Sequence, residues 1–199
     1  MSNKTVNNLD DAALVNRVLK GDNTAFGTVI KNTEGLVARI VFKIVSRIED
    51  RKDIVQDIYL KAFKGLPGFK MRSKLSTWVG NIAYNTCINY LEKKKLVFSG
   101  DLFEGNGDDD EALNNESTFS NETETLVFDK QLSAVLTKEI EKLPPLYKTL
   151  ITLYHNEEMG YAEIGQVTNL PEGTVKSYLF RARKKLKENI LSQYKRDEL

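Results

Sequence analysis

Few residues of this chain have the type and spacing that catalysis or metal binding requires. The sequence holds one cysteine, Cys87, and one histidine, His155, and they fall in stretches of different composition. A multi-thiolate zinc site is therefore excluded, and no glycine-rich phosphate loop follows a strand pattern. We expect no catalytic residue, no metal site, no cofactor and no enzymatic activity. Cys87 is interpreted as a small packed side chain and His155 as a helix-end residue.

Basic side chains instead gather near the carboxyl end, where nucleic-acid binding is the chemistry they suit. At about 100° per residue, a helix through residues 172–187 separates an apolar side from a cationic side. A short helical pattern, in which the small Gly165 allows close approach, and a tight Asn169-Leu170-Pro171 connection precede it, which is helix-turn-helix order. A solvated amphipathic helix is the plainer interpretation, but this context favours duplex DNA. The candidate contacts are Glu172, Gly173, Thr174, Lys176, Ser177, Phe180, Arg181 and Lys184.

A second polar set follows a basic loop at residues 69–74 and continues along the outer side of the next helical pattern. Hydroxyl, amide and aromatic groups beside cations are what single-strand recognition requires: stacking surfaces, base-edge partners and backbone contacts. Ile88 and Leu91 share that outer side, so a helix packed on both faces stays an equal alternative. The candidate residues are Lys70, Arg72, Ser73, Lys74, Thr77, Asn81, Tyr84 and Asn85.

A third face lies on the helical pattern of residues 50–64, whose inward positions include Ile54, Ile58 and Phe63. A leucine, Leu60, stands among polar residues on the outward side. It is either an ordinary exposed apolar residue or the anchor of a protein contact. The outward residues are Asp53, Gln56, Asp57, Leu60 and Lys64.

The elements that position these faces are all predicted to be helices, because apolar residues recur at spacings of three and four without alternation. Asp10 and Asp11 are expected to cap the first helix, and Gly21 with Asp22 to end it and start the next. A stripe at residues 36–45 follows, then helices near 50–64 and 75–95. After 132–143, which stops at Pro144-Pro145, come helices near 147–154, 161–168 and 172–187.

Charge divides the chain into three blocks, although the formal net charge is only +1. Residues 8–95 hold 16 Lys or Arg and 9 Asp or Glu, a net charge of +7. Residues 96–129 hold 10 acidic and no Lys or Arg residues, a net charge of −10, in a polar setting typical of a disordered tether. Residues 130–199 hold 12 basic and 9 acidic residues, +3. We therefore predict helical domains at 8–95 and 130–195, joined by a flexible acidic linker at 96–129.

No targeting or membrane segment is recognised in the sequence. The amino-terminal residues are polar, unlike a signal peptide, and the most apolar stretch, 36–45, is interrupted by Arg39 and Lys43. We expect no membrane insertion and a reducing, cytoplasmic location.

Three segments in order resemble the sigma-70 family of bacterial RNA polymerase sigma factors, specifically the extracytoplasmic-function (ECF) group. Residues 53–63 look like the region 2.2 helix of that family. Phe69 through Asn85, with Ser76-Thr77-Trp78, resembles the segment that recognises and melts the minus-ten promoter element. Residues 143–183, with Gly173-Thr174-Val175-Lys176-Ser177, resemble the domain that reads the minus-thirty-five element.

The resemblance implies a transcription initiation factor with partners rather than substrates. The outward face of residues 53–64 would dock on the beta-prime clamp of core RNA polymerase, and the second domain would meet the beta flap. Promoter DNA would be bound both as duplex and as non-template single strand, with a flipped base held near Asn85. The acidic linker would thread through channels meant for nucleic acid. An anti-sigma protein is a further candidate partner.

This chain departs from the family pattern at three places. The family usually has a Leu-Tyr-Arg type sequence where this chain has Val79-Gly80-Asn81, a basic residue where Tyr178 stands, and Ser or Thr where Gly160 stands. Glycine remains an acceptable helix N-cap. Two other functions stay open on the residues alone: a helix-turn-helix regulator that works without polymerase, and an interaction protein whose basic helices bind an acidic partner.

Overall fold

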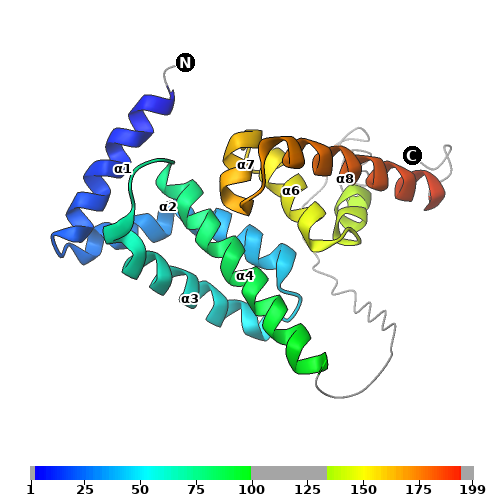
Figure 1. Cartoon of the computed structure of the whole chain (residues 1–199), viewed down its shortest axis with the longest axis horizontal. Coiled ribbons are helices and arrows are strands. Elements are labelled where there is room, and N and C mark those ends of the chain that lie inside the picture. The colour runs from blue at the N-terminus through cyan, green and yellow to red at the C-terminus, as the bar shows by residue number, and fades with distance from the viewer. Residues whose placement is uncertain (1–2, 100–133, 194–199) are drawn as a thin grey trace, which may run out of the picture.

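The computed structural model describes residues 3–99 and 134–193, and every regular element in those ranges is a helix, as predicted (Figure 1). The first group comprises α1 (Asn3–Leu19), α2 (Asn23–Ile44), α3 (Ile48–Gly65), the 3₁₀ turn η1 (Leu66–Gly68) and α4 (Leu75–Ser99). The second comprises a helix at residues 134–141, α6 (Pro145–His155), α7 (Tyr161–Thr168) and α8 (Glu172–Gln193). The predicted linker lies almost entirely outside the described residues.

The junction between α1 and α2 follows the predicted chemistry, but the start of α1 does not. Gly21 takes the left-handed φ of 91°, and the Asp22 carboxylate caps α2 by accepting from the Thr24 and Ala25 amides. Asp10 and Asp11 were expected to cap α1, yet both lie inside that helix. Asp11 instead accepts a hydrogen bond of 2.8 Å from the amide of Leu75, the first residue of α4. Its capping partner is therefore a helix 64 residues further along the chain.

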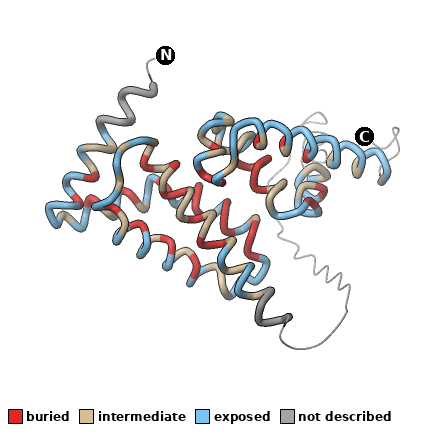
Figure 2. Tube along the Cα trace, viewed as in Figure 1, coloured by how far each residue is buried: buried red, intermediate tan, exposed pale blue. Residues whose placement is uncertain are grey.

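The core of the first group forms where α2, α3 and α4 meet, and Figure 2 shows the buried residues gathered there. The predicted stripe of α2 is buried over its whole length, from Leu36 to Val45, at the spacings of three and four that define one helix face. Ile54 and Ile58 of α3 are also buried. Phe63, predicted to point inward, is 46% exposed, with its ring edge against Phe26 at a centroid distance of 4.9 Å.

The second group forms a helix-turn-helix in which α7 and α8 are joined by a tight turn. Its buried residues include Ile164, Val167, Val175, Leu179 and Ala182. A Cβ at Gly165 would lie 2.6 Å from the Leu170 carbonyl oxygen, so only glycine fits there without displacement. Asn169 ends α7 in the left-handed conformation, with φ of 57°, which asparagine adopts more readily than most residues.

The two groups contact each other through α4 against α7 and α2 against α6. Among the described helices, none is both long and apolar enough to cross a bilayer.

Candidate nucleic-acid interfaces

The outward side of α8 carries the residues predicted to contact duplex DNA. Valine, leucine and alanine at 175, 179 and 182 are buried against α6 and α7, which turns the opposite side of the helix to solvent. An open groove of about 620 Å³ lies along that side, lined by Lys176, Ser177, Phe180, Arg181 and Lys184. The side chain of Phe180, which helps to line this groove, is 68% exposed. All five belong to the predicted set, so the structure brings them onto one face; Glu172 and Gly173 are also exposed, and Thr174 is half-buried.

Stacked rings and cations tie α8 to the helices beneath it. Tyr154 at the end of α6 stacks on Tyr161 at the start of α7, with centroids 5.3 Å apart. Lys176 lies over the Tyr161 ring and Arg183 over the Tyr154 ring, seven residues apart along α8. Hydrogen bonds to Tyr161 and Arg183 lower the pKa of Tyr154. The arrangement fixes how the cationic side of α8 is oriented.

The predicted single-strand face of α4 is only partly open, because α4 packs against α7 as well as α2 and α3. Lys70 and Arg72 in the preceding loop are exposed, while Ser73, Tyr84 and Asn85 are half-buried. Thr77, expected on the outer side, is 1% exposed on a helix that packs against α2, α3 and α7. Burial also raises the pKa of the Tyr84 hydroxyl.

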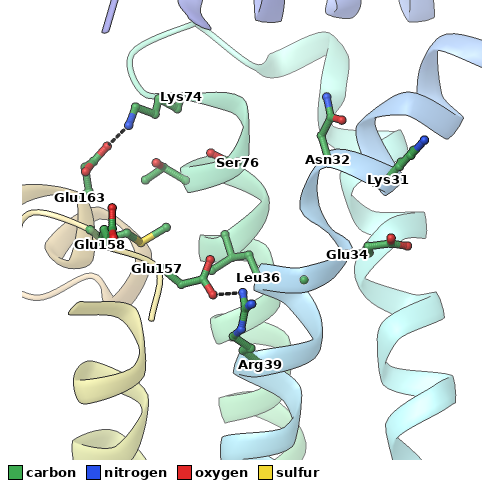
Figure 3. Close-up of a pocket in the computed structure, with 13 residues that line it drawn as sticks. Lys31, Asn32, Glu34, Leu36, Arg39, Lys74, Ser76, Glu157, Glu158 and Glu163 are labelled. Carbon is green, nitrogen blue, oxygen red and sulfur yellow. Dashed lines mark hydrogen bonds and ion pairs between the residues drawn. The ribbon is translucent and has the colours of Figure 1, made fainter. Parts of the chain in front are cut away.

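Several polar groups of this face are already engaged by the second group of helices. Lys74 forms an ion pair with Glu163 of α7 at 2.8 Å (Figure 3). The Asn81 amide donates to the Gln166 carbonyl, and the Asn85 side chain accepts from Asn169. A pocket of about 500 Å³ lies between the two groups of helices, lined by residues of α2, by the start of α4 and by residues 157–163. We call this boundary between the two groups the seam. The alternative that α4 is packed on both faces is thus correct for this arrangement of the chain.

The outward face of α3 contains the predicted residues together with a neighbour that the sequence interpretation placed inside. Asp53, Gln56, Asp57 and Lys64 are exposed, and Leu60 is 51% exposed. Phe63 stands one turn from Leu60 and is exposed too, so the apolar centre of the face has two side chains. The spacing of three between them was the available signal.

Cys87 and His155, the two residues considered for catalysis, lie in different groups of helices. Cys87 is fully buried, and burial raises the pKa of its thiol to about 12, which keeps it protonated at neutral pH. His155 ends α6, as expected, and its pKa is lowered by burial and by Arg183. Within the described residues, no group of three or more His, Cys, Asp or Glu side chains could hold a metal ion.

Two segments of the chain match models of known protein families. Residues 29–97 match the family model for sigma-70 region 2, and residues 133–186 match the model for sigma-70 region 4. The ECF RNA polymerase sigma-E factor of Escherichia coli K12 is 35% identical, covering 92% of this chain and 95% of that protein. The sigma-E factor of Haemophilus influenzae is 33% identical over 92% and 96%, and SigW of Bacillus subtilis is 28% identical over 88% and 94%.

Solved structures of the same fold include two complexes. CnrH bound to the cytosolic domain of CnrY has a TM-score of 0.61 and 18% identity, over 92% of this chain and 99% of that one. The sigma factor RpoE of Bartonella quintana, bound to the anti-sigma factor NepR, has a TM-score of 0.62 and 20% identity, over 85% and 98%.

This chain belongs to the sigma-70 family, in its ECF group of RNA polymerase sigma factors. Its class is that of transcription initiation factors, and the first group of helices is its region 2 domain, the second its region 4 domain.

Proposed function

We propose that this chain directs core RNA polymerase to promoters by binding their minus-ten and minus-thirty-five elements, and that it promotes strand opening. Residues 8–95 dock on polymerase and bind the minus-ten element, residues 130–195 read the minus-thirty-five element, and the acidic segment 96–129 joins them. The chain acts in the cytoplasm with its polymerase. The beta-prime clamp receives the outward face of α3, and the beta flap contacts the region 4 domain.

The observation that carries this proposal is the pairing of an exposed docking face with an exposed cationic helix in one chain. On α3, Leu60 and Phe63 present apolar surface ringed by polar groups, which suits an anchor in a protein interface. On α8, Lys176, Arg181 and Lys184 line an open groove that suits phosphates and base edges of duplex DNA. A regulator that works alone has no use for the first surface.

Strand opening is assigned to the loop 69–74 and α4. We propose that a base of the non-template strand leaves the stack and is held near Asn85, so that its contacts with the protein offset an unstacking cost of a few kcal/mol. Lys70 and Arg72 are exposed in the loop and would contact the phosphates.

The test combines polymerase capture with footprinting. Purified protein is incubated with core RNA polymerase, the complex is captured, and promoter fragments from the same genome are treated with permanganate. We expect thymines upstream of start sites to become reactive only when both proteins are present. DNA binding without polymerase, together with no opening in its presence, would refute the proposal in favour of a helix-turn-helix regulator.

An anti-sigma protein is proposed as a further partner. The supporting observation is that the two solved structures described above are complexes with a second protein, the cytosolic domain of CnrY in one and the anti-sigma factor NepR in the other.

A further inference from the structure

The region 4 domain covers the face of α4 to which the minus-ten strand is assigned, and a glycine permits the close approach. A Cβ at Gly80 would lie 3.3 Å from Val167 of α7 and 3.2 Å from Leu36 of α2. Both distances are tighter than ordinary van der Waals contact. A larger residue would therefore have to displace these two side chains by a few tenths of an ångström.

Asn81, the next residue, caps the carboxyl end of α7. Its Nδ2 donates to the Gln166 carbonyl at 2.8 Å and to the Val167 carbonyl at 3.0 Å. The last carbonyls of a helix have no partner within the helix, and these bonds give two of them a partner on the region 2 domain.

Three asparagine amides then close a ring between the two domains. Asn81 Nδ2 donates to Asn169 Oδ1 at 2.9 Å, Asn169 Nδ2 donates to Asn85 Oδ1 at 2.9 Å, and Asn85 Nδ2 donates to Asn81 Oδ1 at 3.1 Å. The two hydrogens of Asn81 Nδ2 are thus shared among three acceptors, because the Gln166 and Val167 carbonyls also accept from it. Each amide donates once and accepts once within the ring. The side chain at which the flipped base is proposed to be held is thus occupied by the region 4 domain.

Three ion pairs join the two domains near the ring, and all three have the same direction of charge. Lys74 pairs with Glu163, and Arg39 with Glu157, on the seam drawn in Figure 3, while Lys43 pairs with Glu141 further along α2. In each pair the cation belongs to the basic region 2 domain and the carboxylate to the region 4 domain. Such exposed pairs contribute little stability singly, but together they favour one orientation of the two domains.

We infer that Gly80, Asn81, Asn85 and Asn169 form an interdomain latch that holds the free chain closed, with the region 4 domain masking the minus-ten face of α4. The masking role rests on the proposed function, whereas the closed geometry does not. Opening of the latch must precede capture of the single strand, because Asn85 and Lys74 cannot hold both partners at once.

The closed state is tested in the free full-length chain by measuring a distance between the domains. Spin labels are attached at Lys52→Cys on α3 and Lys185→Cys on α8, both exposed positions. The native Cys87 is buried and its pKa of about 12 keeps it unreactive. Pulsed dipolar spectroscopy should give one short, narrow distance distribution for this labelled chain, and a longer, broader population when Asn81→Asp is added.

The substitution Asn81→Asp keeps the shape of the side chain and places a carboxylate against two carbonyl oxygens. Asn89→Asp is the matched control, because it adds the same charge to an exposed position of the same helix, and it should leave the distances unchanged. Asn169→Gly tests the latch from the other side. Glycine keeps the left-handed φ of 57°, so the turn between α7 and α8 is retained while two hydrogen bonds of the ring are lost.

Loss of those two bonds should shift the closed-to-open equilibrium toward the open form by on the order of tenfold. A broad distribution in the unsubstituted chain that neither Asn81→Asp nor Asn169→Gly alters would overturn the latch. This measurement uses neither DNA nor polymerase, so its result is independent of the proposed function.

The masking role is tested with a labelled single strand spanning the permanganate-reactive segment. The free Asn169→Gly chain should bind it up to about tenfold more tightly than the unsubstituted chain, because apparent affinity scales with the fraction of open molecules. Longer distances with unchanged single-strand affinity would refute masking. If no promoter opens with either protein and polymerase, the proposed function fails, while the distances still report whether the latch exists.

Discussion

At the scale of single residues, Leu60 gives the sharpest test of the docking face. It is an exposed leucine ringed by polar side chains, the arrangement found at interface anchors. We expect Leu60→Ala to weaken binding to core RNA polymerase by about 5- to 30-fold, the effect of losing about 1–2 kcal/mol. Leu19→Ala is the matched control, since Leu19 is 49% exposed at the end of α1. Equal affinities of the two variants for labelled core would rule out Leu60 as an anchor.

Asn85 separates strand opening from duplex binding. We expect Asn85→Ala to reduce permanganate reactivity about tenfold or more, since a base-edge partner is lost, while binding to duplex promoter DNA through the region 4 domain persists. Loosening the amide ring would favour opening, so a decrease reports the contact with DNA. Asn89→Ala is the control on the same helix. A parallel loss of opening and duplex binding would count against this division of labour between the domains.

Sequence reasoning at this scale succeeded where a side chain's surroundings are local. The exposure of Leu60 and of the α8 cations follows from helix periodicity alone. Phe63 and Thr77 were placed wrongly because their burial depends on residues distant in the sequence. Phe63 packs edge to face with Phe26 of α2 and stays 46% exposed, and Thr77 is 1% exposed on α4, which packs against α2, α3 and α7.

Among the elements, the cap of α2 gives a pH dependence. Hydrogen bonds from Thr24, from Arg17 and from the Ala25 amide lower the pKa of Asp22 from 3.8 to about 2. A carboxyl whose pKa is lower in the folded state stabilises it fully above the unfolded value, and this contribution is lost as the pH falls toward 2. The difference in thermal midpoint between the unsubstituted chain and Asp22→Asn should therefore shrink between pH 5 and pH 2. A difference independent of pH would contradict the assignment.

The turn between α7 and α8 gives a steric test. Gly165→Ala places a Cβ 2.6 Å from the Leu170 carbonyl oxygen, and we expect a loss of about 1–3 kcal/mol in the free energy of unfolding. Gly27→Ala is the control, because nothing lies within 4 Å of a Cβ at that exposed position of α2. It should stabilise the chain by about 0.5–1 kcal/mol. Denaturant titration distinguishes them, and equal stabilities would show that the turn relaxes freely.

Helix existence was predictable because it depends on residues three and four apart, whereas caps made by distant residues were not. Asp22 lies beside the helix that it caps, and its prediction was correct. Asp11 caps α4 from a position 64 residues earlier in the sequence, and nothing local distinguishes such an aspartate from one that starts its own helix. The same limit hid Asn81, whose acceptors on α7 lie 85 and 86 residues away.

At the scale of the whole molecule, the closed arrangement makes the two proposed DNA faces unequal. The cationic side of α8 is open, lined by Lys176, Arg181 and Lys184, whereas Asn85 on α4 is engaged by Asn169. Charge blocks in the sequence indicated two basic domains but not that the carboxylates of one would meet the cations of the other. Domain contacts depend on surface shape as well as charge, and periodicity carries no information about them.

The free chain should consequently bind duplex DNA through α8 alone, with an affinity that falls as salt rises. Each phosphate contact adds about 0.9 to the slope of log affinity against log salt concentration, so Arg181→Ala with Lys184→Ala should reduce that slope by about 2. The control replaces Lys20 and Lys52, exposed lysines outside both DNA faces, and removes the same charge. Fluorescence anisotropy of a duplex across a potassium chloride series gives both slopes. An equal reduction in the two double variants would mean that net charge, rather than the α8 face, governs the interaction.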